Sequence, residues 1–241
     1  MLLDRGAEIG VHSAKDLPGT MPEELEIAAV PAREDPADVW IGAGRSLDEV
    51  PEGARVGTAS LRRRAQLLAA RPDLRVEELH GNVDTRLRKL EEGGLDGIVL
   101  AAAGLRRLGR EAEIGFAISV DQMVPAAGQG ALALQVRIGD METSEAATAV
   151  NDLRAMRELT AERTAVALLD ATCASPLGAH ARADGASIAI EAFVGLPDGS
   201  EWLRDRVEGS AEEPALAGAE LAQRLLGAGA RELLDRAEEM A

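Results

Sequence analysis

The chain has 241 residues, 46% of them hydrophobic, and a formal net charge of -16 at pH 7, so it can bury a large core and form two or three small domains. Its acidity, with only two Trp, two Phe and no Tyr, argues against a nucleic-acid partner because it offers no stacking platform. The sequence shows no apolar run approaching the roughly 18 residues that span a bilayer and no signal peptide, so we expect a cytoplasmic protein without a membrane partner.

Strands alternate with helices over the first 137 residues, which is the pattern of α/β proteins. Pro and Gly concentrate at 31–36 and 125–130, and this predicts that the chain crosses between two units at these segments. Short buried strands are predicted at 9–12, 38–41, 55–58, 74–78, 97–101 and 131–137.

The pattern of predicted helices and strands changes beyond Thr143. Apolar residues at helical spacing predict one long helix over 146–169. Two strand-like segments follow, at 187–194 and 202–207, joined through a Pro-Asp-Gly turn, and a final pair of helices begins at Pro214. We interpret this part as a separate C-terminal domain.

Positive charge is concentrated between Arg55 and Arg110. This segment has eleven arginines and Lys89 against seven acidic residues, a local charge of about +5 within an acidic chain. An anionic ligand is therefore expected there.

Two helix openings lie among these arginines. Ser60 is predicted to cap a helix over 61–70, and Asn82 or Asp84 to cap a helix over 83–90. Backbone N–H groups at a helix start attract anions, and guanidinium groups match carboxylates in bidentate geometry. Several arginines at two such openings favour a ligand with several carboxylates or phosphates. The simpler alternative is that the run from Arg62 to Arg64 is a solvated helix face.

A polar cluster follows the first predicted strand. His12, Ser13, Lys15 and Asp16 lie within five residues, at a strand end where α/β proteins place ligands, and could combine proton transfer with ion pairing. The alternative is a strand end whose Lys15 and Asp16 are only solvated.

Cys173 is the only cysteine, so an internal disulfide and a cysteine-cluster metal site are excluded. With three scattered histidines, zinc is not expected either. A lone cysteine is more often an inert buried residue than a nucleophile, but the surrounding loop of small residues, Ala171 to Gly178, favours exposure.

Taken together, these segments resemble the porphobilinogen deaminase (hydroxymethylbilane synthase) family of tetrapyrrole biosynthesis. The resemblance runs along nearly the whole chain, and its ordered series of motifs is highly specific. The motifs are VHSAKDLP, AREDPADV, GTASLRRRAQL, RPDL, HGNVDTRL, LDGIVLAAAGLRRLG, VPAAGQGALAL, the TAER helix and the cysteine loop.

The resemblance implies a transferase that joins four porphobilinogen molecules into hydroxymethylbilane with release of four ammonia molecules. The chain would grow on a dipyrromethane cofactor, one per chain, held by a thioether to Cys173. Asp16 matches the catalytic carboxylate, which assists loss of the amino group and stabilises a cationic azafulvene. We expect this carboxylate to be buried, where it would contribute strongly to the electrostatic stabilisation of the developing cation.

The other site residues follow from the same motif matches. Their counterparts bind the acetate and propionate groups of the cofactor and the growing chain, and they are Ser13, Lys15, Ser60, Arg62, Arg63 and Arg86. Weaker matches for substrate binding are His12, His80 and Arg107. His80 stands where the family usually has an arginine, and Ala171-Thr172 stand where it usually has Gly-Gly.

The implied fold is α/β, with two domains resembling type II periplasmic binding proteins, the active site between them, and a small α/β C-terminal domain. The resemblance starts just before VHSAKD, so the first domain is expected to be incomplete, with exposed sheet edges. The domain limits we predict are 1–31 with 131–148, 35–124, and 152–241. We expect a monomer. A dicarboxylate-binding module and an inactive fragment stay open as alternatives.

Overall fold

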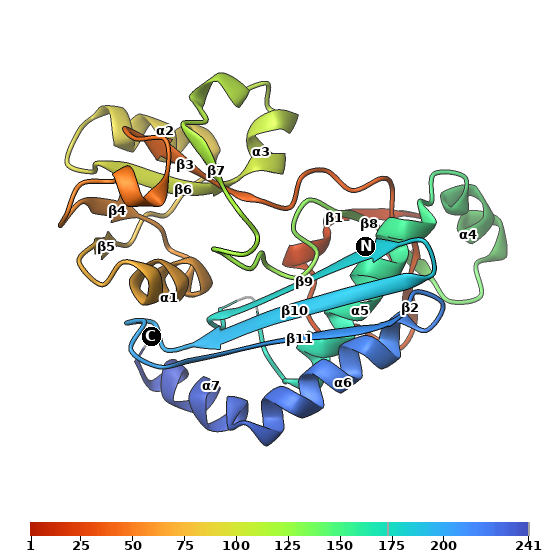
Figure 1. The fold of residues 1–241 in the computed structure, drawn as a ribbon. Coiled ribbons are helices and arrows are strands. Elements are labelled where there is room, and N and C mark those ends of the chain that lie inside the picture. The colour runs from red at the N-terminus through yellow and green to blue at the C-terminus, as the bar shows by residue number, and fades with distance from the viewer. Residues whose placement is uncertain (173, 241) are drawn as a thin grey trace.

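The computed structural model describes residues 1–172 and 174–240. Over these residues the chain forms three β-sheets with helices packed on them (Figure 1). The predicted α/β class is confirmed. The predicted domain limits stay a prediction, although each sheet draws its strands from within one of the three proposed regions.

The first sheet is antiparallel, with β8 between β1 and β2. Its strands come from distant parts of the sequence, and β1 and β2 are its edges. Val11 on β1 is 63% exposed. The elements of this part are β1 (Gly10–Ser13), the 3-10 turn η1 (Ala14–Asp16), β2 (Leu25–Ala29), β8 (Leu132–Arg137) and α4 (Met141–Thr148).

The second sheet has five strands in the order β5-β4-β6-β3-β7. β4 is parallel to β5 and β6, so helices must connect these strands, whereas β3 runs antiparallel to β6 and β7. The elements are β3 (Asp38–Gly42), η2 (Leu47–Glu49), β4 (Arg55–Gly57), α1 (Leu61–Ala70), β5 (Arg75–Glu77), α2 (Val83–Glu91), β6 (Gly97–Ala101), α3 (Ala102–Arg107), η3 (Glu111–Glu113) and β7 (Phe116–Ile118).

This second sheet is mixed, with two parallel and two antiparallel strand pairs, and it is buried on both faces. Val39 and Ile41 of β3 belong to one apolar cluster, and Trp40 between them belongs to another. Trp40 also explains a glycine in β6, because a Cβ at Gly97 would lie 2.1 Å from the indole ring. Only glycine leaves room for the ring there.

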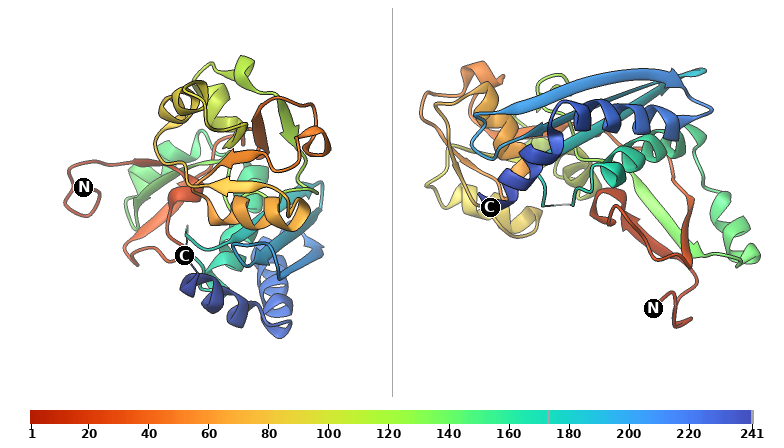
Figure 2. Two further views of the ribbon diagram at one scale, coloured as in Figure 1. Left: turned by 90° about the vertical axis from the view of Figure 1, so that its left-hand side faces the viewer. Right: turned by 90° about the horizontal axis from the view of Figure 1, so that it is seen from below.

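The third sheet is an antiparallel meander, β11-β10-β9, covered by the last helices (Figure 2). Its core joins Ile188 and Ile190 of β10 to Leu221 of α6. α5 and α6 approach closely, since a Cβ at Gly218 would lie 2.2 Å from the Ala161 carbonyl oxygen. The elements are α5 (Leu153–Leu168), β9 (Leu177–Asp184), β10 (Ser187–Gly195), β11 (Trp202–Ser210), α6 (Pro214–Gly227) and α7 (Ala230–Glu239).

The two Pro/Gly segments that connect the first and second sheets run side by side. The Glu34 amide donates to the Gly130 carbonyl (3.2 Å), and the Gln129 side-chain amide donates to the Pro36 carbonyl (2.6 Å). The third sheet joins the same place, because the Ala179 amide of β9 donates to the Pro125 carbonyl. All three parts of the molecule therefore meet at residues 125–130.

The structure corrects one predicted element and adds three. The single helix over 146–169 is wrong: α4 and α5 are separate helices. They separate at Asn151 and Asp152, whose side chains accept hydrogen bonds from the amides of Val30 and Ala155 and so cap α5 and close the turn. The sequence reading also missed β2, β7 and β9. No helix within the described residues is both long and apolar enough to cross a membrane.

Candidate functional site

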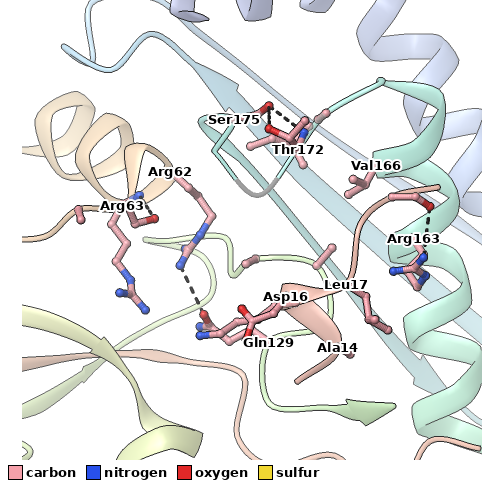
Figure 3. A pocket seen from close by; sticks show the side chains of 18 of the residues that line it. Ala14, Asp16, Leu17, Arg62, Arg63, Gln129, Arg163, Val166, Thr172 and Ser175 are labelled. Carbon is pink, nitrogen blue, oxygen red and sulfur yellow. Dashed lines mark hydrogen bonds between the residues drawn. The ribbon is translucent and has the colours of Figure 1, made fainter. Parts of the chain in front are cut away.

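A cavity of about 330 Å³ opens where the three parts meet, and Figure 3 shows it from close by. Its wall is formed by η1 and the turn after it, the start of α1, Arg86 of α2, the 126–129 segment, α5 and the loop that follows α5. Six of the predicted site residues line it, namely Lys15, Asp16, Ser60, Arg62, Arg63 and Arg86.

The start of α1 forms one side of the cavity. Ser60 caps this helix as predicted, since its hydroxyl accepts a hydrogen bond from the Arg63 amide. The side chains of Arg62 and Arg63 are buried, and Figure 3 shows both extending from α1 into the site. Arg64 is only half-buried. The solvated-face alternative is therefore wrong for two of the three arginines.

The charge of these two arginines is partly balanced by Asp38, which is fully buried at the start of β3. Its carboxylate lies 2.7 Å from Arg62 Nη1 and 2.8 Å from Arg63 Nη2. Burial alone would raise the pKa of Asp38, but the two guanidinium groups outweigh it and hold the pKa well below its usual range. Asp38 is therefore ionised at neutral pH.

Lys15 and Asp16 reach the opposite side of the cavity from η1. This turn is held against the 126–129 segment, because Gly128 has φ +72° and a Cβ there would lie 2.8 Å from Ala14. Burial, assisted by Arg63, lowers the pKa of Lys15 to about 8, although Asp16 and Asp38 oppose the shift. Lys15 is thus the cation here whose charge is easiest to remove.

Asp16 differs from expectation in one respect. It lines the cavity, but it is exposed rather than buried. The reason is its place at the end of the single turn η1, next to the exposed Pro18, where nothing within the described residues covers it. A ligand that filled the cavity would supply that cover.

The second predicted helix opening also contributes. Asn82 caps α2 by accepting a hydrogen bond from the Thr85 amide (2.9 Å), and Arg86 one turn later lines the cavity. The two helix openings therefore bring arginines to one site, as the sequence suggested. The choice left open between Asn82 and Asp84 as the cap is settled for Asn82.

The C-terminal part supplies the remaining wall. Arg163 of α5 donates to the carbonyl oxygens of Pro18 (2.8 Å) and Gly19 (3.2 Å), which fixes the turn after Asp16. Thr172 and Ser175 of the cysteine loop line the cavity, and the Thr172 amide donates to the Ser175 hydroxyl. Cys173, the predicted attachment residue, lies outside the described residues.

Four predicted residues are not on the cavity wall. Ser13 and His12 are half-buried in β1. His80 is exposed, and its Nε2 lies 3.1 Å from the carboxylate of Glu78. Arg107 is exposed too, and its Nη2 donates to the Gly130 carbonyl. These four residues do not line the cavity, and the ligand contacts expected of them stay predictions.

Arg163, Gln129 and Asp38 were not predicted to have a role, and the structure places them at or behind the wall. All three lie inside motifs that carried the resemblance, TAER, VPAAGQGALAL and AREDPADV. The motifs were therefore a usable signal. Their roles depend on contacts between segments far apart in the chain, 91 residues for Gln129 with Asp38 and 145 for Arg163 with Pro18, and no local pattern reports such contacts.

The ionisable side chains of the wall set the class of ligand. Five are cationic, and Asp16 is the one carboxylate among the described lining residues. No group of metal-binding side chains was found in the part of the chain that the structure describes. The cationic residues are Lys15, Arg62, Arg63, Arg86 and Arg163. Even with Asp38 counted, positive charge is in excess, which suits a ligand with several carboxylates.

Comparison with known proteins gives a consistent result. Residues 1–145 match the family described as "Porphobilinogen deaminase, dipyromethane cofactor binding domain", and residues 156–227 match "Porphobilinogen deaminase, C-terminal domain". A porphobilinogen deaminase of Campylobacter concisus is 46% identical over all of this chain and 78% of its own length. One from Thiobacillus denitrificans is 46% identical over 95% of this chain and 75% of its own.

Solved structures are more distant. A TRAP periplasmic solute binding protein from Desulfovibrio salexigens aligns with 64% of this chain and 56% of its own, with 12% identity and a TM-score of 0.37. A likeness at that level supports no argument about the ligand or the reaction.

Proposed function

This chain belongs to the porphobilinogen deaminase family, and from that premise we propose that it is a transferase of tetrapyrrole biosynthesis. It joins four porphobilinogen molecules into hydroxymethylbilane and releases four ammonia molecules, on a covalent dipyrromethane cofactor. The observation that carries the proposal is the cavity itself, where five cationic side chains from three parts of the fold surround Asp16.

The residues of the cavity fit such a cofactor. Each pyrrole ring of the cofactor and the product carries two carboxylates, and the wall offers guanidinium groups from α1, α2 and α5 with the Lys15 ammonium between them. The loop residues Thr172 and Ser175, on either side of Cys173 in sequence, belong to the same wall. The cofactor supplies the pyrrole carbon to which the first substrate is joined, and we assign its thioether to Cys173.

The binding roles follow from position. Arg62, Arg63 and Arg86 hold carboxylates in bidentate geometry, and the Ser60 hydroxyl and Lys15 add single contacts to the same groups. Together they fix the ring that reacts next to Asp16. Ser13 supports this turn from β1, while His12, His80 and Arg107 are kept as weaker candidates for contacts with a longer chain.

Asp16 carries the chemistry. Loss of ammonia from the substrate leaves positive charge on its side-chain carbon, and a carboxylate beside that carbon stabilises the charge as it develops. Asp16 can also hold the proton that the departing amine needs and accept the proton that the newly joined ring releases.

The dicarboxylate-binding module is not favoured, because it gives no role to Asp16 or to the cysteine loop and because the relatives are enzymes by name. We propose that the protein acts in the cytoplasm as a monomer. No nucleic acid or membrane is needed for the reaction.

The proposal is tested by the intact mass of the purified protein and by ammonia release from porphobilinogen. The expected result is an added mass of two pyrrole units that is absent from Cys173→Ala, and ammonia release by the wild type alone. An unmodified wild-type mass together with no ammonia release would reject the proposed activity for this chain. Modified mass without ammonia release would support assembly of the site but reject turnover.

A further inference from the structure

Asp38 is the buried contact shared by the two cavity arginines, and no part of the proposed reaction uses it. It is 0% exposed and lies behind the wall, at the start of β3. Its Oδ2 accepts from Arg62 Nη1 (2.7 Å), and its Oδ1 accepts from Arg63 Nε (2.9 Å) and Gln129 Nε2 (3.1 Å). One carboxylate thus holds two consecutive arginines and the segment where the three parts meet.

The remaining contacts of the two guanidinium groups complete this arrangement. Arg62 also donates to the Val124 carbonyl (2.9 Å). It reaches the Gln129 side-chain oxygen as well (3.5 Å), the contact drawn as a dashed line in Figure 3. Arg63 donates to the Val99 carbonyl (3.0 Å). A guanidinium has five N–H groups, so within the described residues each arginine keeps some of its donors for a ligand. The others fix its plane.

Two buried cations side by side repel each other, and a flexible arginine loses entropy when it is fixed by a ligand. A carboxylate that already binds both arginines reduces their mutual repulsion. It also fixes their side chains, so less entropy is lost when the ligand binds. We propose that Asp38 is a positioning residue that holds Arg62 and Arg63 in the orientation in which they bind substrate and cofactor carboxylates. The inference rests on the proposed function, because it assigns the arginines to that ligand.

Asp38 also acts on Lys15 across the cavity. The groups that face Lys15 are Arg62 and Arg63 from α1, Asp38 from β3 and Asp16 from its own turn. The two carboxylates raise the pKa of Lys15 and the two arginines lower it. Removal of the Asp38 charge should therefore lower the pKa of Lys15 further, which gives a signature that loss of stability alone does not produce.

The test is Asp38→Asn, which keeps the size of the side chain and removes its charge. Kinetics with porphobilinogen are measured per molecule of cofactor-loaded enzyme, counted by intact mass. We expect KM to rise about tenfold, the cost of one lost bidentate contact, while kcat changes less than threefold. The alkaline limit of kcat/KM should move to lower pH. If Asp38 only neutralised part of the positive charge of the cavity, KM would fall instead, because the variant would attract anionic substrate more strongly.

A control separates positioning from stability. Glu158→Gln removes another buried carboxylate that is paired with arginines, Arg33 and Arg154, but lies off the cavity wall. It should lower the midpoint of urea unfolding while KM and the pH limit stay as in the wild type. An active wild type with unchanged KM and pH limit in Asp38→Asn would overturn the inference alone. A wild type that releases no ammonia would overturn the proposed function, and this inference with it.

A milder variant tests the same role if Asp38→Asn does not fold. Gln129→Leu removes the amide that holds both Asp38 and Arg62 and leaves every charge in place. A rise in KM of about threefold, without a shift of the pH limit, is then expected for this smaller loss of order. An unchanged KM in Gln129→Leu would count against the positioning role.

Discussion

Arg33 and Glu162 form a buried ion pair in which Arg33 Nη1 lies 2.7 Å from Glu162 Oε1. Arg33 belongs to one segment that connects the first two sheets, and Glu162 belongs to α5 of the C-terminal part. Glu162 also accepts hydrogen bonds from the amides of Gly128 (2.6 Å) and Ala181 (2.8 Å). A single carboxylate therefore ties both connecting segments to the C-terminal sheet, directly behind the cavity.

Loss of this carboxylate should destabilise the protein. In Glu162→Gln the buried Arg33 keeps only the more distant Glu158, at 3.5 Å. Because Glu158 compensates the buried charge of Arg33 only in part, we expect a loss of about 3 kcal/mol in the free energy of unfolding. Urea unfolding at neutral pH measures it. Glu92→Gln, which removes an exposed partner of Arg88 on α2, is the matched control and should leave the midpoint unchanged.

The same pair predicts an acid-dependent loss of stability. Burial would raise the pKa of Glu162, but Arg33 and then His180 outweigh it and lower the pKa from its ordinary 4.5 to about 2. The unfolded chain binds this proton first as the pH falls, so the contribution is complete above about pH 4.5 and is lost towards pH 2. The stability difference between wild type and Glu162→Gln should therefore shrink between pH 6 and pH 3 in urea unfolding. A constant difference would contradict it.

Local signals made most of the fold predictable. The start of α1 came out at the right residue because its cap, Ser60, was clear, and the start of α2 was also right although its cap was left open between Asn82 and Asp84. β9 was missed because Ala179, Ala181 and Ala183 face its core, and alanine gives little strand signal. The long predicted helix was wrong because apolar spacing continues across Asn151 and Asp152. Asp152 is a local cap of α5 that the spacing masked, and the contact of Asn151 with Val30 depends on the fold.

The site was predictable in its charge and less so in its geometry. Clustered arginines at two helix openings indicated a polyanionic ligand, because charge and capping are local properties. The exposure of Asp16, the position of His80 away from the cavity and the role of Asp38 depend on which segments the fold brings together. Those contacts cannot be read from spacing along the chain.

Gly97→Ala should be among the most destabilising single-methyl changes in the chain. The new Cβ would lie 2.1 Å from the ring of Trp40, which is 0% exposed and has no room to move in the buried sheet. Overpacking of this kind costs about 3 kcal/mol. The midpoint of urea unfolding and the near-ultraviolet circular dichroism of Trp40 measure it. Gly104→Ala in α3, whose Cβ would meet its nearest neighbour at 3.9 Å, should be neutral or stabilising.

The activity should depend on the charge of Lys15. Its pKa in the fold is about 8 against an ordinary 10.5, so the ammonium is charged below pH 8 and is lost above it. We expect kcat/KM for porphobilinogen, which reports the free enzyme, to fall above about pH 8. Lys15→Arg keeps its charge and should move this limit to higher pH. The idea fails if both proteins share the same limit.

The same shift in the pKa of Lys15 makes folding stability rise from pH 8 to 10.5, where the unfolded chain still binds the proton.

Asp16→Asn separates chemistry from structure. Asp16 is exposed on η1, so the amide should leave the midpoint of urea unfolding unchanged. Beside a developing cation, however, the amide lacks the charge that stabilises it, and we expect kcat to fall about 10²- to 10³-fold, with KM within threefold of the wild type. Ammonia release per cofactor-loaded molecule measures both constants. Asp121→Asn, also exposed but away from the cavity, should keep full activity. A fall in kcat of less than tenfold in Asp16→Asn would mean that a group other than Asp16 stabilises the developing cation.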